Sequence, residues 1–196
     1  MHDDAPPSPQ LFLEAANAYQ RTAAIQAAVE LDVFTAIAEG TGEVDDLAER
    51  CAAAPRGVRI LCDYLTILGF LTKQDGRYGL TRDSAVFLDR RSPAYLGTIL
   101  DFIGSADLIG RFGRCAAAVR LGGAADGTGT LAPDDPIWVR FARGMVPMTA
   151  MPAEIMAGMT DFLADRPGAR VLDVAAGLGM YGIAVARRHP GAQVVA

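Results

Sequence analysis

The chain has 196 residues, of which 51% are hydrophobic, and it carries a formal net charge of −5 at pH 7 with an isoelectric point near 5.0. A chain of this length can bury a sizeable core in one or two domains. The negative charge argues against nucleic-acid or anionic-lipid partners, because both are bound by clustered Lys and Arg.

The N-terminal residues and the cysteines indicate a reduced, cytoplasmic protein. Met1–Asp4 is acidic and precedes several prolines, which is unlike a secretory signal. Charges interrupt the longest apolar windows, so we expect no membrane span. Cys51, Cys62 and Cys115 are odd in number and lack C-x-x-C spacing. We therefore expect packed, reduced thiols and no metal site.

The spacing of apolar residues predicts one helix over residues 10–39. The residues that recur three or four apart are Leu11, Ala15, Tyr19, Ala23, Ala27, Leu31 and Phe34. Further apolar residues fill another face of this helix. A helix that is apolar on two faces needs two partners, one of which could be a second copy of the chain. The alternative is a fully buried core helix.

Residues 43–80 carry a helix, helix, hairpin pattern. Acidic residues at 43–46 favour the first turn of a short helix, and Pro55 and Gly69 suit the start and the end of a second one. Asp75-Gly76 is a strong hairpin signal. This order is typical of a winged helix-turn-helix.

The second helix of this pattern favours packing or dimerisation over DNA binding. A recognition helix needs an exposed polar or basic face. Between Ile60 and Leu71, only Asp63 and Thr66 are clearly polar. A winged-helix transcription regulator stays open as an alternative, and it predicts salt-dependent duplex binding by residues 1–100.

Residues 92–165 are expected to be helical around a glycine-rich linker. Two helices are predicted between residues 92 and 119, then the linker at 122–129, then a helix over 138–165. The last helix carries the following sulfur-containing and aromatic side chains: Trp138, Phe141, Met145, Met148, Met151, Met156 and Met159. Such side chains can line a pocket for a flat aromatic ligand or form plain core.

The most informative motif is the apolar run 170–174, which breaks into the small-residue turn 175–179 and a helical segment at 180–188. This pattern predicts a buried strand that delivers bare backbone and a helix N-terminus to a nucleotide-like ligand. A parallel sheet needs several strands. We therefore expect the chain to be the front part of a larger enzyme.

Two cofactor classes suit this turn. Residues 177–182 match G-x-G-x-x-G, which is a dinucleotide fingerprint. However, the small residues begin earlier, at Ala175, and Asp173 at the end of the strand would repel a pyrophosphate. S-adenosylmethionine carries an ammonium and a sulfonium and no phosphate. The carboxylate of Asp173 therefore favours S-adenosylmethionine.

The frame acidic-x-small-x-Gly-x-Gly is held by Asp173, Ala175, Gly177 and Gly179. It resembles motif I of class I S-adenosylmethionine-dependent methyltransferases. With the preceding helices and a Phe-x-x-x-Met connector, the chain from about residue 11 to 196 resembles the small-molecule O-methyltransferases that include plant caffeate and bacterial polyketide enzymes.

The resemblance implies a fold and a domain order. Residues 1–100 would form a mostly α winged-helix dimerisation domain, and residues 101–165 a helical connector. Residues 166–196 would hold the first βα unit of a truncated α/β Rossmann-like methyltransferase domain. The implied assembly is a homodimer through the N-terminal helices.

The resemblance also implies a site for S-adenosylmethionine and a small aromatic or polyketide-like acceptor. The implied cofactor-binding residues are Asp173, Ala175, Gly177, Gly179 and Thr149, and the implied substrate-binding residues are Phe141 and Met145. Ala175 and Ala176 stand where plant members usually carry two glycines, and their methyl groups narrow the approach of backbone to ligand.

No catalytic base is assigned. In the family, the general-base histidine and the acid that holds the ribose would come after residue 196. His2 lies in a proline-bounded tail, and His189 at a helix end is expected to be solvated. A relative that lost methyl transfer, such as a cyclase, a hydroxylase-like protein or a scaffold, is a further alternative.

Overall fold

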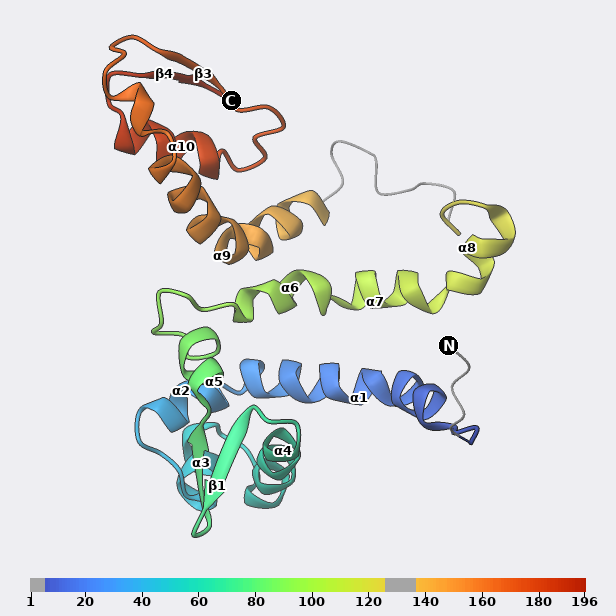
Figure 1. Cartoon of the computed structure of the whole chain (residues 1–196). Coiled ribbons are helices and arrows are strands. Elements are labelled where there is room, and N and C mark those ends of the chain that lie inside the picture. Colours follow the sequence, from blue (N-terminus) through green and yellow to red (C-terminus); the bar gives the residue numbers. More distant parts are fainter. Residues whose placement is uncertain (1–5, 126–136) are drawn as a thin grey trace. The chain divides into compact units, whose positions relative to one another are not determined.

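The computed structural model describes residues 6–125 and 137–196. The chain divides into two compact units, residues 1–95 and 96–196, and each is described by itself (Figure 1). Residues 126–129 of the predicted linker lie outside the described part. The division at residues 100 and 165 remains a prediction.

The first unit begins with two helices, so the prediction of one helix over residues 10–39 is wrong. α1 (Gln10–Glu30) ends before Asp32, whose backbone is left-handed with φ 60°, and α2 (Val33–Ala38) follows. Asp tolerates this conformation better than most residues do. Apolar periodicity continues across the break, which is why the pattern did not reveal it.

α1 is not the fully buried helix that was the alternative interpretation. All of its residues up to Ala23 are exposed, and its buried residues, Ala24 and Ala28, lie towards its C-terminal end. The exposed part carries Leu11, Phe12 and Tyr19. About two-thirds of α1 therefore has no cover within this unit.

The helix, helix, hairpin order is confirmed. The elements are α3 (Val44–Arg50), α4 (Pro55–Ile67), β1 (Leu71–Gln74), β2 (Arg77–Leu80) and α5 (Arg82–Phe87). Strands β1 and β2 pair antiparallel. Both turn residues, Asp75 and Gly76, have positive φ, at 50° and 83°, as a tight turn with matching strand twist requires.

The core of the first unit lies between these helices and the hairpin. Its largest buried side chains include Phe34, Leu47, Val58 and Leu65. Each stabilises the fold by roughly 1.5–3 kcal/mol on burial. Cys51 and Cys62 are also buried, as predicted.

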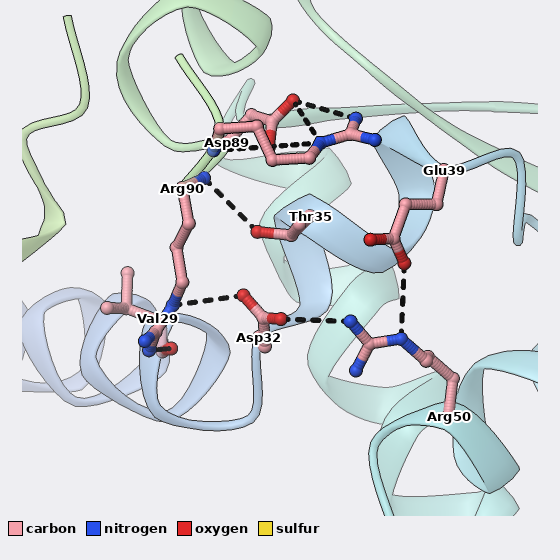
Figure 2. A network of polar contacts seen from close by, with 8 residues as sticks. Val29, Asp32, Thr35, Glu39, Arg50, Asp89 and Arg90 are labelled. Carbon is pink, nitrogen blue, oxygen red and sulfur yellow. Dashed lines mark hydrogen bonds and ion pairs between the residues drawn. The ribbon is translucent and has the colours of Figure 1, made fainter. Parts of the chain in front are cut away.

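A polar network ties the α1–α2 junction to the rest of this unit (Figure 2). Asp32 lies between two arginines: its Oδ2 is 3.1 Å from Arg50 Nη2 and its Oδ1 is 3.0 Å from Arg90 Nε. Arg50 also reaches Glu39, and the Arg90 backbone N–H donates to Thr35 Oγ1. The arginines are partly exposed, so solvent screens these ion pairs and each one contributes little to stability.

Asp63, a polar residue of α4, makes its hydrogen bonds to other residues of the first unit. Asp63 Oδ1 accepts hydrogen bonds from Lys73 Nζ at 2.6 Å and from the Tyr78 hydroxyl at 2.7 Å, both on the hairpin. On the exposed surface of α4, Ile60 and Ile67 are 49% and 81% accessible. This surface suits apolar contact rather than the reading of bases.

The second unit opens with short helical pieces instead of the two predicted helices. They are η1 (Gly97–Ile99), α6 (Leu100–Ile103), α7 (Ala106–Gly113) and α8 (Cys115–Leu121). Ser105 caps α7 by accepting from the Leu108 N–H at 3.3 Å, which restarts the helix after Gly104. Cys115 is exposed, so its predicted packing is wrong.

The rest of this unit is a helix followed by a βαβ segment. Its elements are α9 (Ile137–Gly158), η2 (Asp161–Leu163), β3 (Arg170–Leu172), α10 (Met180–Arg188) and β4 (Gln193–Val195). Strands β3 and β4 are parallel, with Val171 opposite Val194. These two valines pack on buried side chains of α9 and α10.

The prediction of a buried strand at 170–174 is wrong in two respects, because β3 ends at Leu172 and one face of the sheet is exposed. Leu172 is 69% exposed and Val174 is 77% exposed. Only the face with Val171 is covered, because α9 and α10 pack on that face.

Candidate functional site

The turn between β3 and α10 has an unusual backbone. Ala175, Gly177 and Gly179 all have positive φ, at 58°, 57° and 68°. The Gly179 N–H donates to the Ala176 carbonyl at 2.8 Å and closes the turn. Glycine adopts this conformation freely, whereas the alanine strains the turn by roughly 1–2 kcal/mol.

Asp173 follows β3 and joins it to α10. Its Oδ2 accepts a hydrogen bond from the Gly182 N–H at 2.9 Å, and its own N–H donates to the Val195 carbonyl at 2.8 Å. The residue that begins the helix, Gly179, has no side chain to cap it. The carboxylate therefore satisfies an N–H in the first turn of α10, where negative charge is favourable.

Gly182 makes this junction possible. A Cβ at this position would lie 3.0 Å from Asp173 Oδ2 and 3.1 Å from Val194 Cγ1. A glycine lets α10 approach the strands this closely. Our site prediction did not include Gly182, although the third glycine of the G-x-G-x-x-G match pointed to it.

A pocket of about 530 Å³ lies between α9 and this turn, within the second unit. Of the predicted site residues, those that line it are Phe141, Met145, Thr149, Asp173, Ala175 and Gly177. Gly179 does not line it and instead begins α10. The remaining lining residues are Trp138, Ala142, Val174, Ala176, Leu178, Met180 and Tyr181.

The α9 side of the pocket is aromatic. The Phe141 ring meets Phe102 edge-on at 5.2 Å between centroids and meets Trp138 edge-on at 6.2 Å. Such pairs fix ring orientation. Gly144 allows the approach of α6, because a Cβ there would lie 3.1 Å from Phe102 Cβ. Met145 lines the pocket, while Met151 and Met159 are exposed.

Thr149 is oriented by its own helix. Its hydroxyl donates to the carbonyls of Met145 and Val146, both at 3.1 Å. The hydroxyl hydrogen is therefore in use, and the oxygen could meet a ligand only as an acceptor. Donation from this hydroxyl to a ligand would first require release of these two carbonyls.

His189 is buried, so the prediction that it is solvated is wrong. Its Nε2 lies 3.1 Å from Thr160 Oγ1, and that hydroxyl donates to the Ala157 carbonyl at 2.6 Å. Because the hydroxyl hydrogen is used, Nε2 must be the donor. His189 does not line the 530 Å³ pocket and lies at the end of α10.

Comparison with known proteins gives a consistent result. Residues 13–90 match the O-methyltransferase dimerisation domain. A 3-hydroxy-5-methyl-1-naphthoate 3-O-methyltransferase from Streptomyces sahachiroi is 28% identical over 93% of this chain and 53% of its own length. The predicted resemblance to S-adenosylmethionine-dependent O-methyltransferases is confirmed.

Solved structures agree with this finding. A candidate O-methyltransferase from Nostoc punctiforme is 47% identical, with a TM-score of 0.86 over 97% of this chain and 56% of its own. CalO1, a methyltransferase of calicheamicin biosynthesis, was solved in its SAH-bound form and is 25% identical. The match has a TM-score of 0.70 and covers 97% of this chain and 59% of CalO1. The chain spans little more than half the length of these relatives. The similarities support S-adenosylmethionine as cofactor and do not favour a transcription regulator.

None of the helices among residues 6–125 and 137–196 has both the length and the apolar character that a membrane crossing requires.

Proposed function

We propose that this chain provides the dimerisation domain, the connector and the cofactor turn of an S-adenosylmethionine-dependent O-methyltransferase that acts on a small aromatic or polyketide-like acceptor. The observation that carries the proposal is a single pocket in which a carboxylate and a glycine turn face an aromatic wall on α9. Its volume lies in the usual range for small-molecule sites.

The residues of the turn fit this cofactor. Asp173 brings a negative charge to the pocket, and Ala175 and Gly177 bring bare backbone. These residues, with Gly179 beginning the helix and Thr149 offering an acceptor, would hold a ligand that carries an ammonium. A pyrophosphate would be repelled by the same carboxylate. When bound, S-adenosylmethionine supplies a methyl group that is already activated by its sulfonium.

The aromatic wall would orient the acceptor. Phe141 and Met145 offer an apolar surface to a flat ring, and the edge-on contacts with Phe102 and Trp138 hold the Phe141 ring in place. Alignment of the acceptor oxygen with the methyl group is a large part of catalysis for such a donor. We assign removal of the acceptor proton to no described residue.

We further propose that the protein is a homodimer formed through its N-terminal helices. The match to a dimerisation domain over residues 13–90 and the exposed apolar residues of α1 support this assembly. The α3–α4–hairpin segment would act as a winged helix that packs against protein. We propose boundaries near residues 100 and 165 and a Rossmann-like domain that begins at 166.

The proposal is tested by methyl transfer from radiolabelled S-adenosylmethionine to hydroxynaphthoates, chosen from the substrate in the name of the S. sahachiroi relative. We expect label in the organic extract that depends on both protein and acceptor. Binding of S-adenosylmethionine without transfer to any of a panel of phenolic acceptors would favour a relative that lost methyl transfer.

A further inference from the structure

The short contact between Gly182 and Asp173 has a consequence for how the pocket recognises a ligand. The Gly182 N–H occupies Asp173 Oδ2 at 2.9 Å, and Oδ1 makes no hydrogen bond to the residues that the structure describes. Asp173 also lines the pocket. One carboxylate oxygen is thus fixed by α10, and the other is left for a ligand.

The fixed oxygen sets the orientation of the whole carboxylate. A freely rotating side chain would lose rotational entropy on binding a ligand, whereas a side chain that is already held loses less. The contact requires the absence of a Cβ at residue 182, since one would sit 3.0 Å from Oδ2 and 3.4 Å from Asp173 Cβ. Any larger residue there must displace the carboxylate or α10.

We propose that Gly182 is a positioning residue for the cofactor, because it holds the Asp173 carboxylate ready for the ammonium group of the ligand's amino-acid part. This inference rests on the proposed function and deepens it, because it assigns the orientation of the Asp173 carboxylate to Gly182. Gly182 touches no reacting atom and acts through Asp173.

Two substitutions separate orientation from charge. Gly182→Ala forces Asp173 or Val194 to move by a few tenths of an ångström and lengthens the hydrogen bond. Asp173→Asn keeps an oxygen that accepts from the Gly182 N–H and removes the charge. The matched control is Gly110→Ala in α7, where a Cβ would meet no atom of the described residues within 4 Å.

Two ligands separate the halves of the cofactor. S-adenosylhomocysteine and 5′-methylthioadenosine share the adenosine and a neutral sulfur, and only the first carries the ammonium and carboxylate. Titration calorimetry on the intact protein measures both. We expect Gly182→Ala to weaken S-adenosylhomocysteine about fivefold and Asp173→Asn to weaken it about tenfold, as for a charge-assisted hydrogen bond partly or fully lost.

The result expected for 5′-methylthioadenosine is unchanged affinity in both variants and in the Gly110→Ala control. Thermal unfolding of Gly182→Ala should stay near that of the unsubstituted protein, because alanine favours the helix and offsets the displacement. Equal weakening of both ligands would overturn the inference, since the substitution would then act on the whole turn. Unchanged affinity of Gly182→Ala for both ligands would also overturn the inference. If the folded, unsubstituted protein binds neither ligand, the proposed function itself fails, and the inference fails with it.

Discussion

Replacement of Ala175 by glycine should stabilise the second unit, although it deletes a methyl group. Ala175 has φ 58°, a conformation that costs an L-residue roughly 1–2 kcal/mol. Glycine removes this strain. It also raises the conformational entropy of the unfolded chain, which destabilises the fold by roughly 0.4–1 kcal/mol. The balance is a gain of about 0.5–1 kcal/mol in the free energy of unfolding.

The assay is urea unfolding followed by the fluorescence of Trp138, the single tryptophan of the chain, which lies on α9 in the same unit. With a typical slope of about 2 kcal/mol/M, the midpoint should rise by about 0.3–0.5 M. The matched control is Ala176→Gly. Ala176 is not among the residues with positive φ, so its midpoint should fall. A fall of similar size for Ala175→Gly would refute the strain argument.

Three further predictions concern the first unit and the cysteines. Phe12→Lys places a charge on an exposed apolar site and should shift the proposed dimer towards monomer, raising its dissociation constant about tenfold or more in light scattering. The hydrogen bond from the Lys73 ammonium lowers the pKa of Asp63, so this group stabilises the fold above its unfolded pKa, and that stability is lost as pH falls below about 4. Asp63→Asn should flatten the fall of melting temperature in this acid range, and an unchanged fall would contradict the assignment. Burial raises the pKa of the Cys62 thiol to about 12, so iodoacetamide at neutral pH should label the exposed Cys115 and spare Cys62 until urea is added, as peptide mass spectrometry can measure.

Much of the architecture could be predicted because local chemistry specifies it. The Asp75-Gly76 turn, the start of α4 at Pro55 and the strand, turn and helix around Asp173 follow from residues that act on their immediate neighbours. The pocket brings together most of the predicted site residues because the turn and α9 each present them on one side.

The features that the sequence did not predict depend on contacts between residues far apart in the chain. The break at Asp32 relies on arginines that come 18 and 58 positions later, which apolar periodicity cannot reveal. The buried ring of His189 has its Nε2 satisfied by Thr160, a residue of a distant turn. The role of Gly182 depends on its distance to Asp173 and Val194, and a motif match alone does not give this distance.

Calorimetric titration of the intact protein with S-adenosylmethionine and, separately, with NADH tests the central claim most directly. We predict a dissociation constant in the micromolar range for S-adenosylmethionine and no heat of binding from NADH up to about 500 µM, because the carboxylate at the glycine turn attracts a cation and repels a pyrophosphate. Tight binding of NADH with none of S-adenosylmethionine would contradict the account.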